Sequence, residues 1–148
     1  MESKVFNLGG DKPIQFILGI EQSTLVPSWI ATIDEFWLLI VGNALYSAIK
    51  SHEFLCINKS LDDEKDFAAT MNITSFNSLL LTGEAARFQD YVKAIMEFSL
   101  REHISPSPTM YISFISETSS HAVNAIVEFE KGIIMFGGNL GEKLSNLK

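Results

Sequence analysis

The chain has 148 residues, of which 47% are apolar, and a formal net charge of −7. This length suits one domain that buries enough surface to fold without disulfides or metals, and the apolar content argues against disorder. The negative charge argues against a nucleic-acid surface and against binding to anionic membranes. It favours solubility, or a basic protein partner.

The cysteine usage and the first residues bear on location. Cys56 is the only cysteine and cannot form an internal disulfide, which favours a reducing, cytoplasmic setting. Residues 1–7 contain no basic stretch followed by an apolar core, so no signal peptide is expected, although export by a route without one stays open. The most apolar run, residues 36–41, is too short to span a bilayer.

The N-terminal part predicts two strands and a helix. Residues 4–8 and 13–20 have strand composition. Pro27 and Ser28 then predict a helix start, with Ser28 as the N-cap. Apolar residues follow at helical spacing and define one face, namely Ile30, Ile33, Trp37, Val41, Ala44 and Ala48. Gly42 interrupts this pattern and would cost about 1 kcal/mol inside a helix.

The middle of the chain contains the clearest predicted helix, residues 82–103. Its apolar residues form one stripe, namely Ala85, Phe88, Val92, Ile95, Met96 and Leu100. Pro106 and Pro108 end this helix. Before it, residues 54–57 predict a brief strand, whereas residues 72–81 fit a helix and a strand equally well.

The tail predicts an antiparallel sheet. Residues 109–115, 122–129 and 133–136 have strand character, and Lys131-Gly132 predicts a tight turn between the last two strands. We therefore expect one α+β domain over residues 1–148, with helices in the N-terminal and middle regions and an antiparallel sheet towards the C-terminus.

Metal and cofactor sites are not expected. The three histidines, His52, His103 and His121, and the cysteine lack the spacing of metal ligands. The chain also contains neither a Gly-x-Gly-x-x-Gly motif nor a Gly-Lys-Ser/Thr phosphate loop.

A cysteine-hydrolase arrangement is the remaining candidate for chemistry. Such a site needs a nucleophile at a helix N-terminus, a histidine base, and a third polar group that orients the histidine. The predicted C-terminal hairpin would bring His121 and Asn139 to the same end of two paired strands. The side-chain carbonyl of Asn139 could then orient the imidazole.

The tail resembles the C-terminal half of papain-like cysteine hydrolases, and most of all their bacterial effector branch. The similar runs are residues 110–115 (MYISFI), 120–126 (SHAVNAI) and 132–142 (GIIMFGGNLGE). The resemblance implies His121 as the base. It places the orienting acid at Gly137, where this chain has no carboxylate, and Asn139 is the nearest replacement.

Residues 42–49 (GNALYSAI) are similar to the Gly-Asn-Cys-Leu-Tyr-x-Ala-Ile motif of ovarian-tumour-type deubiquitinases. The nucleophile of that motif falls on Ala44, which has no nucleophilic atom. The resemblance implies hydrolysis of a peptide, isopeptide or glutamine amide on a protein substrate. Ala44 then marks a natural pseudoenzyme, a substituted nucleophile position, or an accidental match.

Other interpretations stay open beside this one. Ala44 also fits the core of one continuous helix, and His121 fits a structural histidine at a strand end. Cys56 is a rival nucleophile, with His52 or His121 as its base. The whole chain also fits a small acidic binding protein without chemistry, such as a toxin-immunity protein or a secretion chaperone, with a basic partner.

Overall fold

The structure is a computed structural model that describes residues 3–6, 13–21, 26–51, 56–57, 67–78, 84–102 and 108–140. Its strands are β1 (Ser3–Phe6), β2 (Ile14–Glu21), β3 (Val26–Ile33), β4 (Cys56–Ile57), β5 (Phe67–Asn72), β6 (Thr109–Ser116), β7 (Ala122–Glu128) and β8 (Ile133–Gly138). Its helices are α1 (Glu35–Ser51), α2 (Ile73–Ser78) and α3 (Glu84–Arg101).

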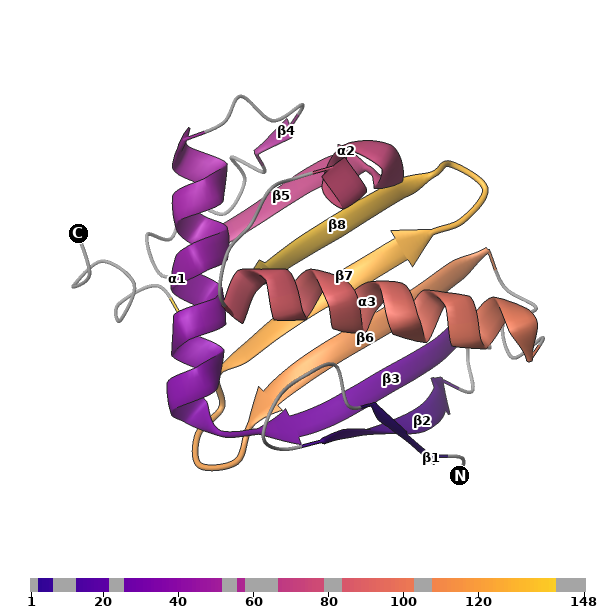
Figure 1. The fold of residues 1–148 in the computed structure, drawn as a ribbon, viewed down its shortest axis with the longest axis horizontal. Coiled ribbons are helices and arrows are strands. Elements are labelled where there is room, and N and C mark those ends of the chain that lie inside the picture. The colour runs from indigo at the N-terminus through magenta and orange to yellow at the C-terminus, as the bar shows by residue number, and fades with distance from the viewer. Residues whose placement is uncertain are drawn as a thin grey trace.

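The described strands form one eight-stranded sheet in the order β1-β2-β3-β6-β7-β8-β5-β4 (Figure 1). Neighbouring strands are antiparallel except β3 and β6, which run parallel, with Ile33 opposite Ser116 at their ends. This pairing joins the N-terminal strands to the predicted C-terminal hairpins. The α+β prediction is confirmed.

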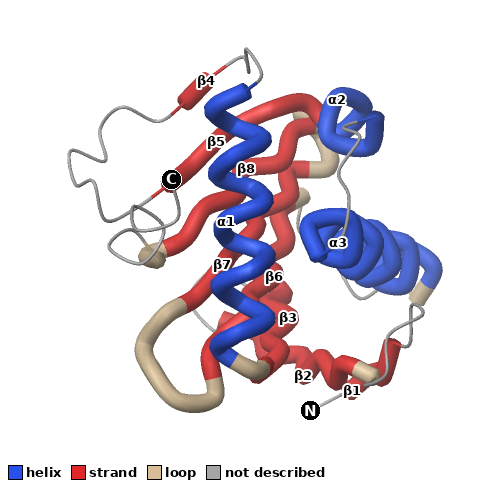
Figure 2. Tube along the Cα trace, turned by 60° about the vertical axis from the view of Figure 1, so that its left-hand side comes forward, coloured by secondary structure: helices blue, strands red, loops and turns tan. Residues whose placement is uncertain are grey.

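The helices lie together on one face of the sheet, as the two views of Figures 1 and 2 show. Side chains in the central strands alternate accordingly, since every second residue of β6 is buried beneath the helices. Phe114 of β6 is at the centre of this core. Its ring lies 5.7 Å from that of Trp37 in α1 and 5.1 Å from that of Phe88 in α3, measured between centroids.

The predicted helix start at Ser28 is wrong, because residues 26–33 form β3. Trp29, Ala31 and Ile33 are buried while Ile30 is 36% exposed, which is the period of a strand. The buried indole N–H of Trp29 donates to the Ser99 hydroxyl of α3 at 2.9 Å, which ties this strand to the helical layer. The helix begins only at Glu35.

The other predicted elements agree better with the structure. The helix expected over residues 82–103 is α3, and the three strands of the tail are β6, β7 and β8. Gly132 has a φ of 65° in the turn before β8, as the tight-turn prediction requires. The ambiguous stretch begins with the last residue of β5 and continues as α2, whose start is capped by Asn72 through the Ser75 N–H at 2.5 Å.

Candidate functional site at the start of α1

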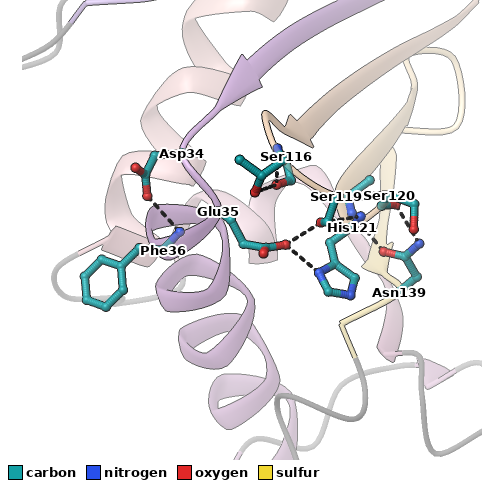
Figure 3. A network of polar contacts seen from close by, with 10 residues as sticks. Asp34, Glu35, Phe36, Ser116, Ser119, Ser120, His121 and Asn139 are labelled. Carbon is teal, nitrogen blue, oxygen red and sulfur yellow. Dashed lines mark hydrogen bonds and ion pairs between the residues drawn. The ribbon is translucent and has the colours of Figure 1, made fainter.

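The site begins where the chain leaves β3 and enters α1. The Asp34 carboxylate accepts hydrogen bonds from the backbone N–H groups of Phe36 at 2.7 Å and Trp37 at 3.3 Å, so Asp34 is the N-cap. Glu35 is therefore the first helical residue, and its position is set by this cap. Figure 3 shows its carboxylate extending from the helix towards His121.

The hairpin between β6 and β7 supplies the opposite side of the site. The Glu117 N–H donates to the Ile33 carbonyl at 2.8 Å, and the Ser116 N–H donates to the His121 carbonyl at 3.0 Å. The Ser119 hydroxyl accepts the His121 N–H at 3.1 Å. These bonds place His121 at the entry to β7, beside the first turn of α1.

Glu35 and His121 form the central contact of the site. Glu35 Oε1 lies 2.6 Å from His121 Nδ1, and the Ser119 hydroxyl donates to the same carboxylate oxygen. When the ring is neutral, the tautomer that can donate to an ionised Glu35 has its proton on Nδ1 and its lone pair on Nε2. Within the described ranges Nε2 has no hydrogen-bond partner. The side chains are 24% and 21% exposed for His121 and Glu35, respectively.

Asn139 also lies at this site, but its side chain hydrogen-bonds to backbone groups and not to the imidazole. Its side-chain oxygen accepts the Ala122 N–H at 2.8 Å, and its amide nitrogen donates to the Ser120 carbonyl at 3.1 Å. Ser120 and Ala122 flank His121 in the sequence. Figure 3 shows Asn139 beside Ser120. Asn139 therefore positions His121 through the chain, while Glu35 orients the ring.

Ala44 lies away from this site. Helix α1 is continuous through Gly42, so it does not begin at residue 43 or 44 as a papain-like nucleophile requires. Ala44 follows Glu35 by nine residues, which at 1.5 Å and 100° per residue places it about 13 Å further along α1 and on the opposite side of the helix. The structure therefore does not bring Ala44 to His121.

Gly137, where the resemblance places the orienting acid, has no room for a side chain. A Cβ atom there would overlap the carbonyl oxygen of Phe67 and lie 3.2 Å from the Cα of Ala68. The close approach of β5 and β8 thus requires glycine at this position. The carboxylate that orients His121 comes instead from Glu35, 86 residues earlier in the chain.

The rival cysteine site falls largely outside the described part of the structure. Cys56 pairs with Thr70 at the edge of the sheet, and nothing is described of its side chain. His52 and His103 lie outside the described residues. Among the residues that are described, no group of three His, Cys, Asp or Glu side chains could hold a metal ion.

The sheet also has a shallow hollow, with a volume of ≈ 380 Å³, over β5, β7 and β8. Its lining includes Asn124, Ile126 and Met135, which point away from the helices because they alternate with the buried residues of their strands. His121 contacts α1 on the helical side. The hollow and the histidine therefore lie on opposite faces of the sheet.

Comparison of the chain with protein-family models, with curated proteins and with solved structures gave no match. Of the helices in the described ranges, none has the length and apolar character needed to cross a bilayer.

Sequence reasoning placed His121 and Asn139 at the same end of the hairpin, where the structure also has them, but it did not include Glu35. The reason is the predicted helix start at Ser28, which placed Glu35 in the middle of a helix and not at its first turn. The adjacent acidic pair Asp34-Glu35, directly after an apolar strand, was the signal that could have located the cap.

Proposed function

We propose that this chain is an acyl hydrolase in which His121, oriented by Glu35, is the general base, and that water replaces the missing thiol as nucleophile. The observation that carries the proposal is the 2.6 Å contact between Glu35 Oε1 and His121 Nδ1. It supplies the orienting carboxylate that the motif at Gly137 lacks. The motif resemblance and the geometry thus point independently to His121.

In the proposed reaction one proton moves from water to Nε2 of His121 and from there to the leaving group. Nε2 accepts a proton from water while the water oxygen attacks the carbonyl carbon, and Glu35 stabilises the resulting imidazolium. Nε2 then returns the proton to the leaving group as the acyl bond breaks. A general base contributes about 10²–10⁴-fold, which suits esters and thioesters better than amides. Activated acyl bonds are therefore the substrates on which the activity should first be measurable.

The direct test is the hydrolysis of p-nitrophenyl acetate by a Cys56→Ser protein, which removes the competing thiol. We expect His121→Asn to lower the rate by about 10²-fold and Glu35→Gln to lower it by about tenfold. His103→Asn is the matched control for the background reactivity of any histidine. Equal rates for the parent and His121→Asn, with circular dichroism showing both folded, would refute the proposal.

A thiol mechanism at residue 44 makes a different prediction. An Ala44→Cys/Cys56→Ser protein would react with a thiol-reactive ubiquitin or peptide probe if residue 44 were the nucleophile position. We expect the rate of labelling to be no higher than that of an unactivated thiol, because residue 44 faces away from Glu35 on an unbroken helix. Reaction that depends on His121 would favour the papain-like mechanism instead.

The alternative is a small acidic binding protein, such as a toxin-immunity protein or a secretion chaperone. It is favoured by the hydrogen bonds among Glu35, Ser119 and His121, because such bonds also suit a purely structural role in which they join α1 to the β6–β7 hairpin. The net charge of −7 then predicts a basic partner whose affinity falls with salt. A hydrolysis rate independent of His121, together with salt-sensitive binding of a basic protein from the native source, would select this alternative.

A further inference from the structure

None of the described helices covers the second face of the sheet, because all of them lie on the other side (Figures 1 and 2). The side chains of this second face alternate along each strand with the buried ones, and cross-strand pairing aligns them in two central rows. The first row runs from β2 to β5 through Ile17, Ile30, Ser113, Asn124, Gly137 and Ala68. The second row runs in the same order through Gly19, Ser28, Tyr111, Ile126, Met135 and Thr70. We call these two rows the open face.

The open face carries no charge. Its residues include no Asp, Glu, Lys, Arg or His, although 20% of the chain is charged. Ile17 and Ile30 are nevertheless 44% and 36% exposed, so the face presents apolar side chains to the solvent. The sheet face that an antiparallel sheet turns to water is usually polar. An uncharged, partly apolar face is instead typical of a surface that another molecule covers.

The absence of charge also indicates the kind of partner. A basic protein would need carboxylates on the surface that it binds, and the open face has none. Two copies of this chain each carry a net charge of −7 and repel one another, so they can associate only where the contact itself brings no like charges together. The open face meets this condition.

The shape of the open face is complementary to itself. In the first row the bulky side chains of Ile17 and Ile30 lie at the β2 end. The small residues Gly137 and Ala68 lie at the other end, in the hollow over β5, β7 and β8. Two sheets that pack face to face about a two-fold axis along the strands, between β6 and β7, turn each row end for end. Ile17 then lies opposite Ala68 of the second copy, and Ile30 lies opposite its Gly137.

The other contacts about this axis also match. In the second row Ser28 of β3 is small and Met135 of β8 is long and flexible, and the axis places one opposite the other. At the centre of the first row Ser113 lies opposite Asn124 of the second copy, so the two polar side chains can hydrogen-bond to each other. The polar residues of the open face therefore meet polar residues when it is covered.

We infer that a second copy of this chain covers the open face and forms a two-fold symmetric dimer. Six strands spaced about 4.8 Å apart and about 20 Å long present about 600 Å² per copy. Two copies would bury about 1,200 Å², which reaches the lower end of the range for specific, stable interfaces. The inference does not rest on the proposed function, because His121 contacts α1 on the opposite, helical side of the sheet.

Sedimentation equilibrium of the unmodified chain tests this inference, with a reducing agent present so that a disulfide between two Cys56 thiols is not mistaken for the interface. We expect twice the chain mass of 16.5 kDa, falling towards the chain mass on dilution. Raising the salt to about 1 M should strengthen the dimer, because screening removes the repulsion between the two acidic copies. Binding of a basic partner would instead weaken with salt.

Paired substitutions test the position of the axis. Ile17→Lys and Ala68→Glu should each weaken the dimer at least about tenfold, because each buries an unpaired charge. An equimolar mixture of the two variants should dimerise again, since the axis places the ammonium of one opposite the carboxylate of the other. Phe36→Glu is the matched control, because it adds a charge at a side chain that is 72% exposed on α1, on the helical side of the sheet. Circular dichroism checks that each variant is folded.

Two results would overturn the dimer. One is a monomer at every concentration, at high salt as well as low. Slow thiol labelling of Ile17→Cys/Cys56→Ser in that monomer would show that another part of the chain covers the open face, and rapid labelling would show that the face is open to solvent. The other is a dimer that Phe36→Glu weakens while Ile17→Lys and Ala68→Glu do not, because its interface would then lie on the helical side.

Discussion

At the scale of single residues, the two glycines at the end of β8 show how closely the strands approach one another. A Cβ atom on Gly138 would lie 2.5 Å from the Ala122 carbonyl oxygen, and one on Gly137 would overlap the Phe67 carbonyl oxygen. Backbone atoms cannot turn away as a flexible side chain can. Glycine at these positions is therefore a packing requirement, and the next residue, Asn139, hydrogen-bonds to the backbone on both sides of His121.

This packing predicts the effect of Gly137→Ala. We expect it to lower the free energy of unfolding by about 1–3 kcal/mol, because strands β5 and β8 must separate to admit the methyl group. Gly19→Ala is the matched control, since its Cβ would have only an ordinary contact at 3.8 Å, and its effect should stay within about 0.5 kcal/mol. Urea denaturation of both variants measures the difference. Equal stabilities would contradict the close approach.

At the scale of elements, the start of α1 connects helix stability to the candidate site. Asp34 caps two N–H groups, and the next residue, Glu35, contacts His121. A frayed first turn would move the Glu35 carboxylate away from the ring. The cap therefore affects both the stability of α1 and the orientation of the histidine.

Asp34→Ala should cost about 1 kcal/mol of stability through loss of the cap. It should also lower the His121-dependent esterase rate, because the Glu35 carboxylate is less well held. Asp90→Ala is the control, because Asp90 is an exposed residue within α3. Its substitution removes the same charge without uncapping a helix. Thermal denaturation and the p-nitrophenyl acetate rate report the two effects. Full stability of Asp34→Ala would show that the cap contributes little.

At the scale of the whole molecule, the strand order predicts a gradient of local stability. Strands β6 and β7 occupy the middle of the sheet and are paired on both sides, whereas β1 is paired only with β2. Breaking a central strand disrupts two ladders and the core around Phe114, which an edge strand does not. The central strands should therefore open only with global unfolding.

Amide hydrogen exchange measures this gradient directly. We expect the slowest exchange in β6 and β7 and the fastest strand exchange in the edge strands β1 and β4, with the amides of β8 close to those of β7. The candidate site lies between the junction of β3 with α1 and the β6–β7 hairpin. Its backbone amides should therefore exchange slowly, like those of the central strands. Protection in β1 equal to that in β7 would contradict this strand order.

The sequence alone determined the elements whose pattern is local. The apolar stripe of α3 and the alternation of β6, β7 and β8 depend only on near neighbours, so the α+β class and the C-terminal hairpins were predictable. The same patterns indicated His121 and Asn139 at one end of the hairpin. The stretch of residues 26–33 misled because the spacing of Ile30 and Ile33, continued by Trp37 of α1, also fits a helix.

Only the tertiary structure decided what surrounds His121. The parallel pairing of β3 with β6 crosses more than 80 residues, with Ser28 opposite Tyr111, and local periodicity does not encode such a pairing. This pairing brings the start of α1 to the hairpin and so gives His121 the carboxylate of Glu35. The approach of β5 to β8 likewise leaves no space for an acid at Gly137, because it depends on how distant segments pack together. Ala44 lies on the far side of α1 from Glu35 because the helix is unbroken between the two residues.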